Sequence, residues 1–141
     1  MADRISIELP EQFPFTTRLT VRIGDINYGN HVGNDAMLRL MQDARLRFLA
    51  ERGWSELDAA GASLIMTDAA VIYRSQARFG DELQIGVAVR DLTRTGFAFV
   101  YRISQVKDGA EVARGQTGMA FFDYTRNRVA RMPEAFRQAF G

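Results

Sequence analysis

Residues 34–52, NDAMLRLMQDARLRFLAER, place the strongest constraint on the fold, because they contain neither glycine nor proline and repeat apolar side chains at spacings of three and four. This periodicity predicts an amphipathic helix with a wide apolar face. Asn34 or Asp35 is expected to cap the start of the helix, since both residue types are favoured there. Gly53 is expected to end it in the left-handed backbone conformation. A helix with this much apolar surface needs an extended layer to cover it.

The segments on both sides of the helix carry patterns typical of strands. Leu19, Val21 and Ile23 alternate with polar residues within residues 15–25, which predicts a strand that ends at Gly24. The chain after the helix is rich in β-branched and aromatic residues and is interrupted by short turns that contain glycine. Four further strands are expected at residues 63–76, 82–93, 96–106 and 111–125.

Two segments depart from the strand pattern. Residues 54–61, WSELDAAG, predict a short turn of helix followed by a loop. Residues 133–140, PEAFRQAF, predict a short C-terminal helix with Pro133 in its first turn, where the missing N–H group has no partner to lose. The predicted order is therefore a strand, a helix, four strands and a short helix.

This order predicts a single α+β domain over residues 1–141, in which one helix packs on a largely antiparallel sheet. The sheet must curve to cover so wide an apolar helix face. Its edge strands then offer unpaired backbone groups, which invite pairing with another chain. We expect a homodimer with a continuous sheet. Whether two such dimers pair into a homotetramer stays open at this stage.

The composition restricts partners and cofactors. The chain has a net charge of +1, no cysteine and one histidine, and it contains no polybasic run. Nucleic-acid binding therefore has no electrostatic support, and neither a disulfide framework nor a structural zinc site is expected. No apolar stretch approaches the roughly 20 residues of a membrane span. Residues 1–12 contain acids and lack the apolar core of a signal peptide, so we expect a cytoplasmic protein that does not bind membranes.

The residues best suited to chemistry gather at the expected start of the helix, in residues 24–37, GDINYGNHVGNDAM. This segment holds His31, and an imidazole can accept a proton or donate a hydrogen bond near neutral pH. The first backbone N–H groups of a helix have no partner within it. Those of Val32, Gly33 and Asn34 are therefore candidates to bind the negatively charged oxygen of a reacting carbonyl.

Three aspartates in or near this segment are candidate proton acceptors. Asp25 follows the expected strand, where an aspartate also commonly stabilises a turn. Asp35 is well placed as a base, but capping the helix is a sufficient role for it. Asp43 lies two turns further along the helix. Pairing with Arg39 or Arg47 is the simpler role for Asp43, because residues four apart are neighbours on a helix.

The motif and the order of elements resemble hotdog-fold acyl-CoA thioesterases of the 4-hydroxybenzoyl-CoA thioesterase type. That family carries D-x-D-x-x-G-H-V-N-N between its first strand and its central helix, and residues 25–34 of this chain are similar to it. Residues 42–45, QDAR, are similar to the family's E-x-A-R. Residues 73–85, YRSQARFGDELQI, and residues 106–137 are similar to later family segments. The resemblance covers nearly the whole chain.

The resemblance implies a hotdog fold, in which a long central helix is wrapped by a curved, largely antiparallel five-stranded sheet. It also implies hydrolysis of an acyl-CoA thioester to the free acid and CoA, by water attack, with no metal and no cofactor other than the CoA of the substrate. The acyl group is not specified. Val32, Gly33, Asn34 and Asp43 would then contact the substrate. Four arginines near strand ends and turns are candidates for the CoA phosphates and cannot be ranked from the sequence: Arg74, Arg78, Arg94 and Arg126.

One position departs from the family pattern. The second aspartate of D-x-D is the family's usual catalytic carboxylate, and Asn27 stands there in this chain. An amide cannot take a proton from water near neutral pH, although it can hold a water or a substrate carbonyl, or stabilise the turn. The proton acceptor is therefore expected to be Asp35 together with His31, then Asp25, then Asp43.

Two other functions stay open from the sequence. Hotdog enoyl-thioester hydratases carry G-D-x-N-P-x-H-x-D, which residues 24–35 resemble. In this chain, however, His31 lies one residue farther from Asp25 than in that motif, and Tyr28 replaces the proline. The third function is binding of an acyl thioester without turnover, which Asn27 would explain.

Overall fold

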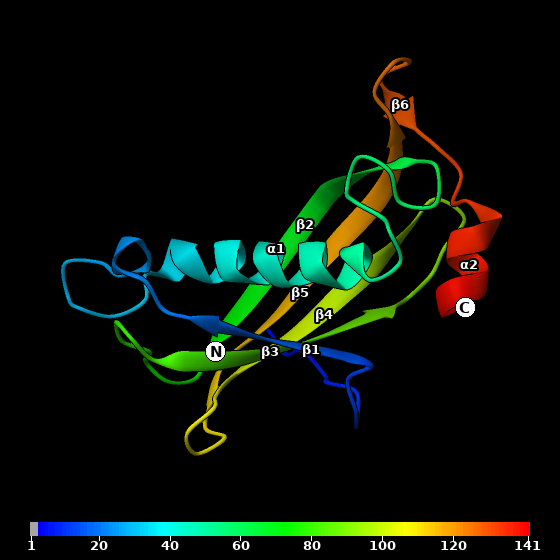
Figure 1. Cartoon of the computed structure of the whole chain (residues 1–141). Helices are drawn as coiled ribbons and strands as arrows, with labels where there is room; N and C mark the ends of the chain where they lie inside the picture. The colour runs from blue at the N-terminus through cyan, green and yellow to red at the C-terminus, as the bar shows by residue number, and fades with distance from the viewer. Residues whose placement is uncertain (1–2) are drawn as a thin grey trace.

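The computed structural model describes residues 3–141 and contains one six-stranded antiparallel sheet and two helices (Figure 1). The strands of the main path follow one another in space in the order β1 (Phe15–Thr20), β3 (Glu82–Arg90), β4 (Gly96–Gln105), β5 (Glu111–Asp123) and β2 (Ser63–Tyr73). The short β6 (Arg128–Val129) pairs with β5 outside this path. β1 and β2 are therefore the opposite edges of the sheet.

The helix α1 (Asn34–Ala50) lies across one face of the sheet, with β2, β5 and β4 running behind it (Figure 1). Its apolar side, including the fully buried Met41 and Leu49, packs against Phe99 and Tyr101 of β4 in one continuous core. This hotdog-like α+β arrangement confirms the expected layout. At 17 residues, α1 has an ordinary length for a globular protein, roughly 8–20 residues, so the expectation of a long central helix is not confirmed.

The N-terminal end of α1 differs from the expectation, whereas its C-terminal end agrees with it. Gly33, in extended conformation, precedes the first helical residue, and no side chain caps the helix. The expectation that Asn34 or Asp35 caps it is therefore wrong, because both already lie within the first turn. At the other end, Gly53 adopts a φ of 73°. Its N–H bonds the Ala50 carbonyl over 2.9 Å, so the left-handed ending is confirmed.

The strand before the helix is shorter than expected. β1 ends at Thr20, and Ile23–Asp25 form a 3-10 turn whose Ile23 side chain is exposed. The carboxylate of Asp25 accepts a hydrogen bond from the N–H of Arg22 over 2.9 Å, which closes this turn. The predicted continuation to Gly24 is wrong because this local bond replaces the pairing between strands.

The segment after α1 also differs from the expectation. Residues 54–61, all of them described, form turns and contain no helix, so the predicted helical turn there is wrong. The hydroxyl of Ser55 accepts a hydrogen bond from the N–H of Asp58, which favours a turn over a helix.

The sequence also missed β6, whose two residues are too few for a periodic pattern. The C-terminal helix α2 (Glu134–Phe140) was expected, and Pro133 immediately precedes it.

The N-terminal segment covers part of the sheet face opposite α1. Ile7 is buried there against Ala88 and Val100. Arg90 and Arg114 hold the segment by donating to the carbonyl oxygens of residues 8 and 7, respectively. No helix in the described part of the chain is long and apolar enough to cross a membrane.

Candidate active site

The loop between the 3-10 turn and α1 is a tight, backbone-bonded turn. The N–H of Asn27 donates to the carbonyl of His31 over 2.8 Å, and the N–H of Asn30 donates to the carbonyl of Asn27 over 3.0 Å. Asn30 accepts the left-handed conformation at a φ of 65°, which asparagine tolerates better than most residues. Ile26 and Val32 pair across the base of the loop. The loop therefore brings His31 back to the start of α1.

Asn27 stabilises this loop through its side chain. Its Oδ1 accepts hydrogen bonds from the N–H groups of Gly29, over 2.9 Å, and His31, over 3.4 Å. Two backbone donors identify that atom as the amide oxygen. The amide NH₂ group has no acceptor among residues 3–141. Asn27 therefore supports the turn and still has a hydrogen-bond donor to offer.

The backbone N–H groups at the start of α1 are not all free. Val32 donates to the carbonyl of Ala77 over 2.8 Å, and Gly33 donates to the carbonyl of Asp25 over 3.0 Å. The N–H of Asn34 has no acceptor in the described part of the chain. Of the three N–H groups considered from the sequence, that of Asn34 is therefore the one available to an oxyanion.

A cavity of about 300 Å³ opens beside these groups, and we call it the His31 cavity. The hydroxyl of Tyr73 donates to the carbonyl of Asn34 over 2.9 Å, so the end of β2 is tied to the start of α1. Met37 supplies an apolar wall. The cavity is lined by Asn27, His31, Val32, Asn34, Met37, Tyr73, Arg74, Ser75 and Gln76.

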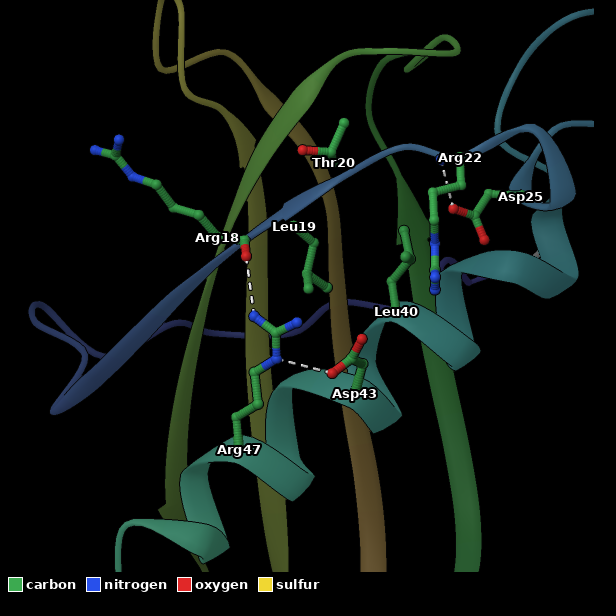
Figure 2. A pocket seen from close by; sticks show the side chains of 8 residues that line it. All are labelled: Arg18, Leu19, Thr20, Arg22, Asp25, Leu40, Asp43 and Arg47. Carbon is green, nitrogen blue, oxygen red and sulfur yellow. Dashed lines mark hydrogen bonds and ion pairs between the residues drawn. The ribbon is translucent and has the colours of Figure 1, made fainter.

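A second cavity, of about 380 Å³, lies between β1 and α1, and we call it the Asp25 cavity (Figure 2). Asp25 lies at one end of it, held by the N–H of Arg22. Asp43 forms an ion pair with Arg47 over 2.9 Å, and Arg47 also donates to the carbonyl of Arg18. The lining consists of Arg18, Leu19, Thr20, Arg22, Asp25, Leu40, Asp43 and Arg47.

The structure therefore divides the residues singled out in the sequence between two sites. Asn27, His31, Val32 and Asn34 line the His31 cavity, next to β2, whereas the two aspartates just described line the Asp25 cavity, next to β1. The two strands are opposite edges of the sheet.

Asp35 lines neither cavity. Its carboxylate lies over the backbone of Gly33, so close that a Cβ atom on Gly33 would approach Asp35 Oδ1 to 2.7 Å. A side chain at position 33 would therefore displace the flexible carboxylate of Asp35 from this place. The negative charge of Asp35 also lies in the first turn of α1, where it interacts favourably with the helix dipole.

Sequence reasoning missed Tyr73, the last residue of β2, and Ser75 and Gln76, which follow the strand. They lie in residues 73–85, which resemble a family segment, but that resemblance assigned them no role, because their place beside α1 depends on the order of the strands. Among the four arginines considered for CoA phosphates, Arg74 lines the His31 cavity. Residues 3–141 contain no group of three or more histidine, cysteine, aspartate or glutamate side chains placed to hold a metal ion.

Solved structures share this fold. A 1,4-dihydroxy-2-naphthoyl-CoA thioesterase from Synechocystis is 22% identical, with a TM-score of 0.80, covering 89% of this chain and 93% of that chain. A thioesterase from Thermus thermophilus, in complex with coenzyme A and zinc, is 27% identical, with a TM-score of 0.77 and coverage of 90% and 97%. A hypothetical protein from Staphylococcus aureus in complex with CoA is 21% identical, with a TM-score of 0.79 and coverage of 94% and 84%.

No curated protein sequence matches the chain. The family model of the thioesterase-like superfamily matches residues 21–140, which includes the loop, both helices and every strand after the first. The chain belongs to the thioesterase-like superfamily.

Proposed function

We propose that the protein hydrolyses acyl-CoA thioesters and that the reaction takes place in the His31 cavity. Family membership supports a thioester hydrolase, and the Thermus thermophilus thioesterase with bound coenzyme A supports a CoA ligand. One observation carries the assignment of the site. His31 and Asn34 line the same cavity, and in this proposal the His31 imidazole is the proton acceptor and the Asn34 N–H, which has no acceptor in the described part of the chain, is the oxyanion donor.

The proposed reaction needs only water and these groups. His31 takes a proton from water as its oxygen bonds to the thioester carbon, and the carbonyl oxygen becomes negatively charged. The N–H of Asn34, at the positive end of α1, donates to that oxygen. The carbonyl then re-forms, the carbon–sulfur bond breaks, and the thiolate takes the proton back from His31. The products are the free acid and CoA.

Asn27 and Asp35 have supporting roles in this proposal. The free NH₂ group of Asn27 is suited to hold the substrate carbonyl or the attacking water. Asp35 lies outside the cavity lining, so we assign the proton to His31 and leave Asp35 to stabilise the first turn of α1. No metal or further cofactor takes part in the proposed reaction.

We propose that aromatic acyl-CoA thioesters of the 4-hydroxybenzoyl-CoA type are among the substrates, because of the sequence resemblance. The test is the release of free thiol from a panel of aliphatic and aromatic acyl-CoA thioesters by the purified protein. Hydrolysis of at least one is expected, whereas failure with the whole panel would overturn the proposal.

We also propose that the protein is a homodimer whose two sheets join along β2. This strand pairs with β5 on one side, and no strand among residues 3–141 covers its other side. Met66 and Tyr73 are exposed on it. Sedimentation analysis is expected to give the mass of two chains, and a stable monomer would contradict this arrangement.

Of the two alternative functions, the structure favours acyl-thioester binding without turnover over enoyl-thioester hydration. A hydratase dyad would need Asp25 and His31 to act on the same water, but they line different cavities. Binding without turnover is favoured by Asn27, whose amide oxygen supports the loop in place of a catalytic carboxylate. A binding protein would be stabilised against heat by an acyl-CoA that it leaves intact. A hydratase would convert crotonyl-CoA to 3-hydroxybutyryl-CoA.

A further inference from the structure

Two four-residue segments of the chain share one sequence pattern and form the same turn. Residues 22–25 read RIGD, and residues 78–81 read RFGD. In each segment, the N–H of the arginine donates to the carboxylate of the aspartate over 2.9 Å. The N–H of the aspartate donates in return to the carbonyl of the arginine, over 2.9 Å in the first segment and 3.0 Å in the second. Figure 2 shows the carboxylate bond between Arg22 and Asp25. We call these two segments the twin turns.

The twin turns lie side by side where β1 ends and β3 begins. Thr20 and Glu82 are partners in the register of these strands. The next residue, Val21, continues the pairing, since its N–H donates to the carbonyl of Asp81 over 2.9 Å and its carbonyl accepts from the N–H of Gly80 over 3.0 Å. Val21 is buried in the core. The twin turns are therefore fixed to the sheet.

Each turn holds one N–H group of the segment that leads into α1. The carbonyl of Asp25, the last residue of the first turn, accepts from the N–H of Gly33 over 3.0 Å. The carbonyl of Ala77, the residue before the second turn, accepts from the N–H of Val32 over 2.8 Å. Two consecutive N–H groups are thus held in place, and the next one, that of Asn34, is left to act as a donor.

The direction of the Asn34 N–H follows from the same contacts. The carbonyl of Gly33 accepts from the N–H of Ala36 over 3.0 Å, within the first turn of α1. The C=O and N–H groups of a trans peptide point in opposite directions, so the N–H of Asn34 points out of the N-terminal end of the helix. A shift of Gly33 would turn this peptide and the donor with it.

The carboxylates of the twin turns hold their shape and lie away from the reacting groups. Asp25 is 9% exposed, so water replaces its bond to the Arg22 N–H poorly. Asp81 also accepts a hydrogen bond from Nε2 of Gln105 over 2.9 Å. Neither aspartate lines the His31 cavity, so neither is placed to take a proton from water there.

We propose that Asp25 and Asp81 are positioning residues, whose turns place the N–H of Asn34 to bind the oxyanion during thioester hydrolysis. This inference rests on the proposed function for its reaction. It gives Asp25, which the sequence suggested as a proton acceptor, a role that needs no proton transfer. An amide side chain also accepts hydrogen bonds, so asparagine serves the turn as aspartate does, whereas the methyl group of alanine does not.

The test compares Asp25→Ala with Asp25→Asn, and Asp81→Ala with Asp81→Asn. Each alanine variant is expected to lower kcat about tenfold and to keep KM within about twofold, because a small displacement of a catalytic group lowers the rate. Each asparagine variant is expected to keep kcat within about threefold of the wild-type value. The pH dependence of kcat is expected to keep its shape in all four variants, since His31 remains the proton acceptor.

Asp58→Ala is the matched control. Asp58 closes a turn after α1 by accepting from the N–H of Gly61 over 2.9 Å, and it lines neither cavity. This variant is expected to keep the wild-type kcat. An unchanged kcat in Asp25→Ala or in Asp81→Ala would overturn the inference, as would an equal loss in Asp58→Ala. An equal loss in Asp25→Asn and Asp25→Ala would also overturn it and identify a catalytic carboxylate.

Amide hydrogen exchange, measured by NMR, separates this inference from the proposed function. The N–H of Gly33 is expected to exchange faster in Asp25→Ala, and that of Val32 faster in Asp81→Ala, because their acceptors are no longer held. Both are expected to keep the wild-type rate in the asparagine variants. If this pattern holds and the wild type hydrolyses no thioester, the positioning of the segment stands and the proposed function fails. If thioesters are hydrolysed and exchange is unchanged in the alanine variants, this inference fails alone.

Discussion

The hydroxyl of Tyr73 donates a hydrogen bond to the carbonyl oxygen of Asn34 over 2.9 Å, and it thereby joins the end of the edge strand β2 to the first residue of α1. The same Asn34 lines the His31 cavity, and its N–H is the oxyanion donor in the proposed reaction. Tyr73 is therefore a positioning residue, since it holds the peptide next to the proposed oxyanion donor and does not itself react.

Tyr73→Phe keeps the ring and removes this hydrogen bond. We expect kcat to fall by about tenfold and the free energy of unfolding to fall by about 1 kcal/mol, the usual net contribution of such a bond. Steady-state kinetics and urea unfolding measure the two effects. A higher KM with an unchanged kcat would instead assign Tyr73 to substrate binding alone.

Asp35→Asn tests whether the proton acceptor is Asp35, as first expected from the sequence. Asp35 lines neither cavity and lies in the first turn of α1. The substitution is therefore expected to lower the free energy of unfolding by about 0.5 kcal/mol, because it removes a charge that interacts with the helix dipole. We expect kcat to stay within about threefold of the wild-type value, a smaller loss than removal of a general base causes. A hundredfold loss of kcat, with the fold intact by circular dichroism, would return the role of base to Asp35.

Glu56→Gln tests a partly buried ion pair that lies in neither cavity. Glu56 accepts a hydrogen bond from Nε of Arg45 over 2.5 Å, and the Arg45 side chain is 5% exposed. Arg45 also approaches the hydroxyl of Tyr101, which bonds Thr117 over 2.8 Å. Removing the carboxylate leaves a buried charge uncompensated. We expect a loss of about 2–3 kcal/mol, less than for a fully enclosed pair, because Glu56 is partly exposed.

The exposed pair of Asp43 and Arg47 is the matched control for this ion pair. Asp43→Asn is expected to cost less than about 0.5 kcal/mol, because water screens the two charges. Urea unfolding of both variants measures the difference. If Glu56→Gln and Asp43→Asn lowered the free energy of unfolding equally, burial of Arg45 would not explain the larger loss expected for Glu56→Gln.

The stability of the protein is expected to fall in acid because of Glu111 and Asp81. Hydrogen bonds from the Arg78 N–H and the Gln105 side chain lower the pKa of Asp81, and arginine contacts lower that of Glu111. A lowered pKa in the folded state means that the unfolded chain binds protons more readily. This stability is therefore complete above the ordinary values of 3.8 and 4.5 and is lost as the pH falls through the lowered values.

Urea unfolding as a function of pH measures this effect. Glu111→Gln is expected to flatten the decrease in the free energy of unfolding in acid. A variant that keeps the full wild-type slope would show that Glu111 does not contribute to it.

The sequence predicted much of the fold because periodicity is a local property. The spacing of apolar residues predicted α1 to within two residues of its C-terminal end, and the left-handed Gly53 was identified by residue type alone. The errors have local causes as well. At Ile23, a hydrogen bond from the Arg22 N–H to the Asp25 carboxylate closes a turn in place of the strand that the alternation favoured.

The site could be predicted only in part, because it depends on contacts between distant segments. The sequence placed Asp25 and His31 together, since they are close along the chain. In the structure they line different cavities: Asp25 lines the cavity beside β1, and His31 lines the cavity beside β2, although the Asp25 carbonyl bonds the N–H of Gly33 at the start of α1. The N–H of Val32 donates to the carbonyl of Ala77, which lies in a loop far along the chain. No local pattern encodes such a bond.

The most direct test of the central claim is kcat for one hydrolysed acyl-CoA in His31→Ala and in Asp43→Asn. The first variant removes the proposed proton acceptor from the His31 cavity, and the second removes a carboxylate from the Asp25 cavity. We expect kcat to fall at least about a hundredfold in His31→Ala and to stay near the wild-type value in Asp43→Asn. Full activity in His31→Ala together with a hundredfold loss in Asp43→Asn would contradict the account and move the chemistry to the Asp25 cavity.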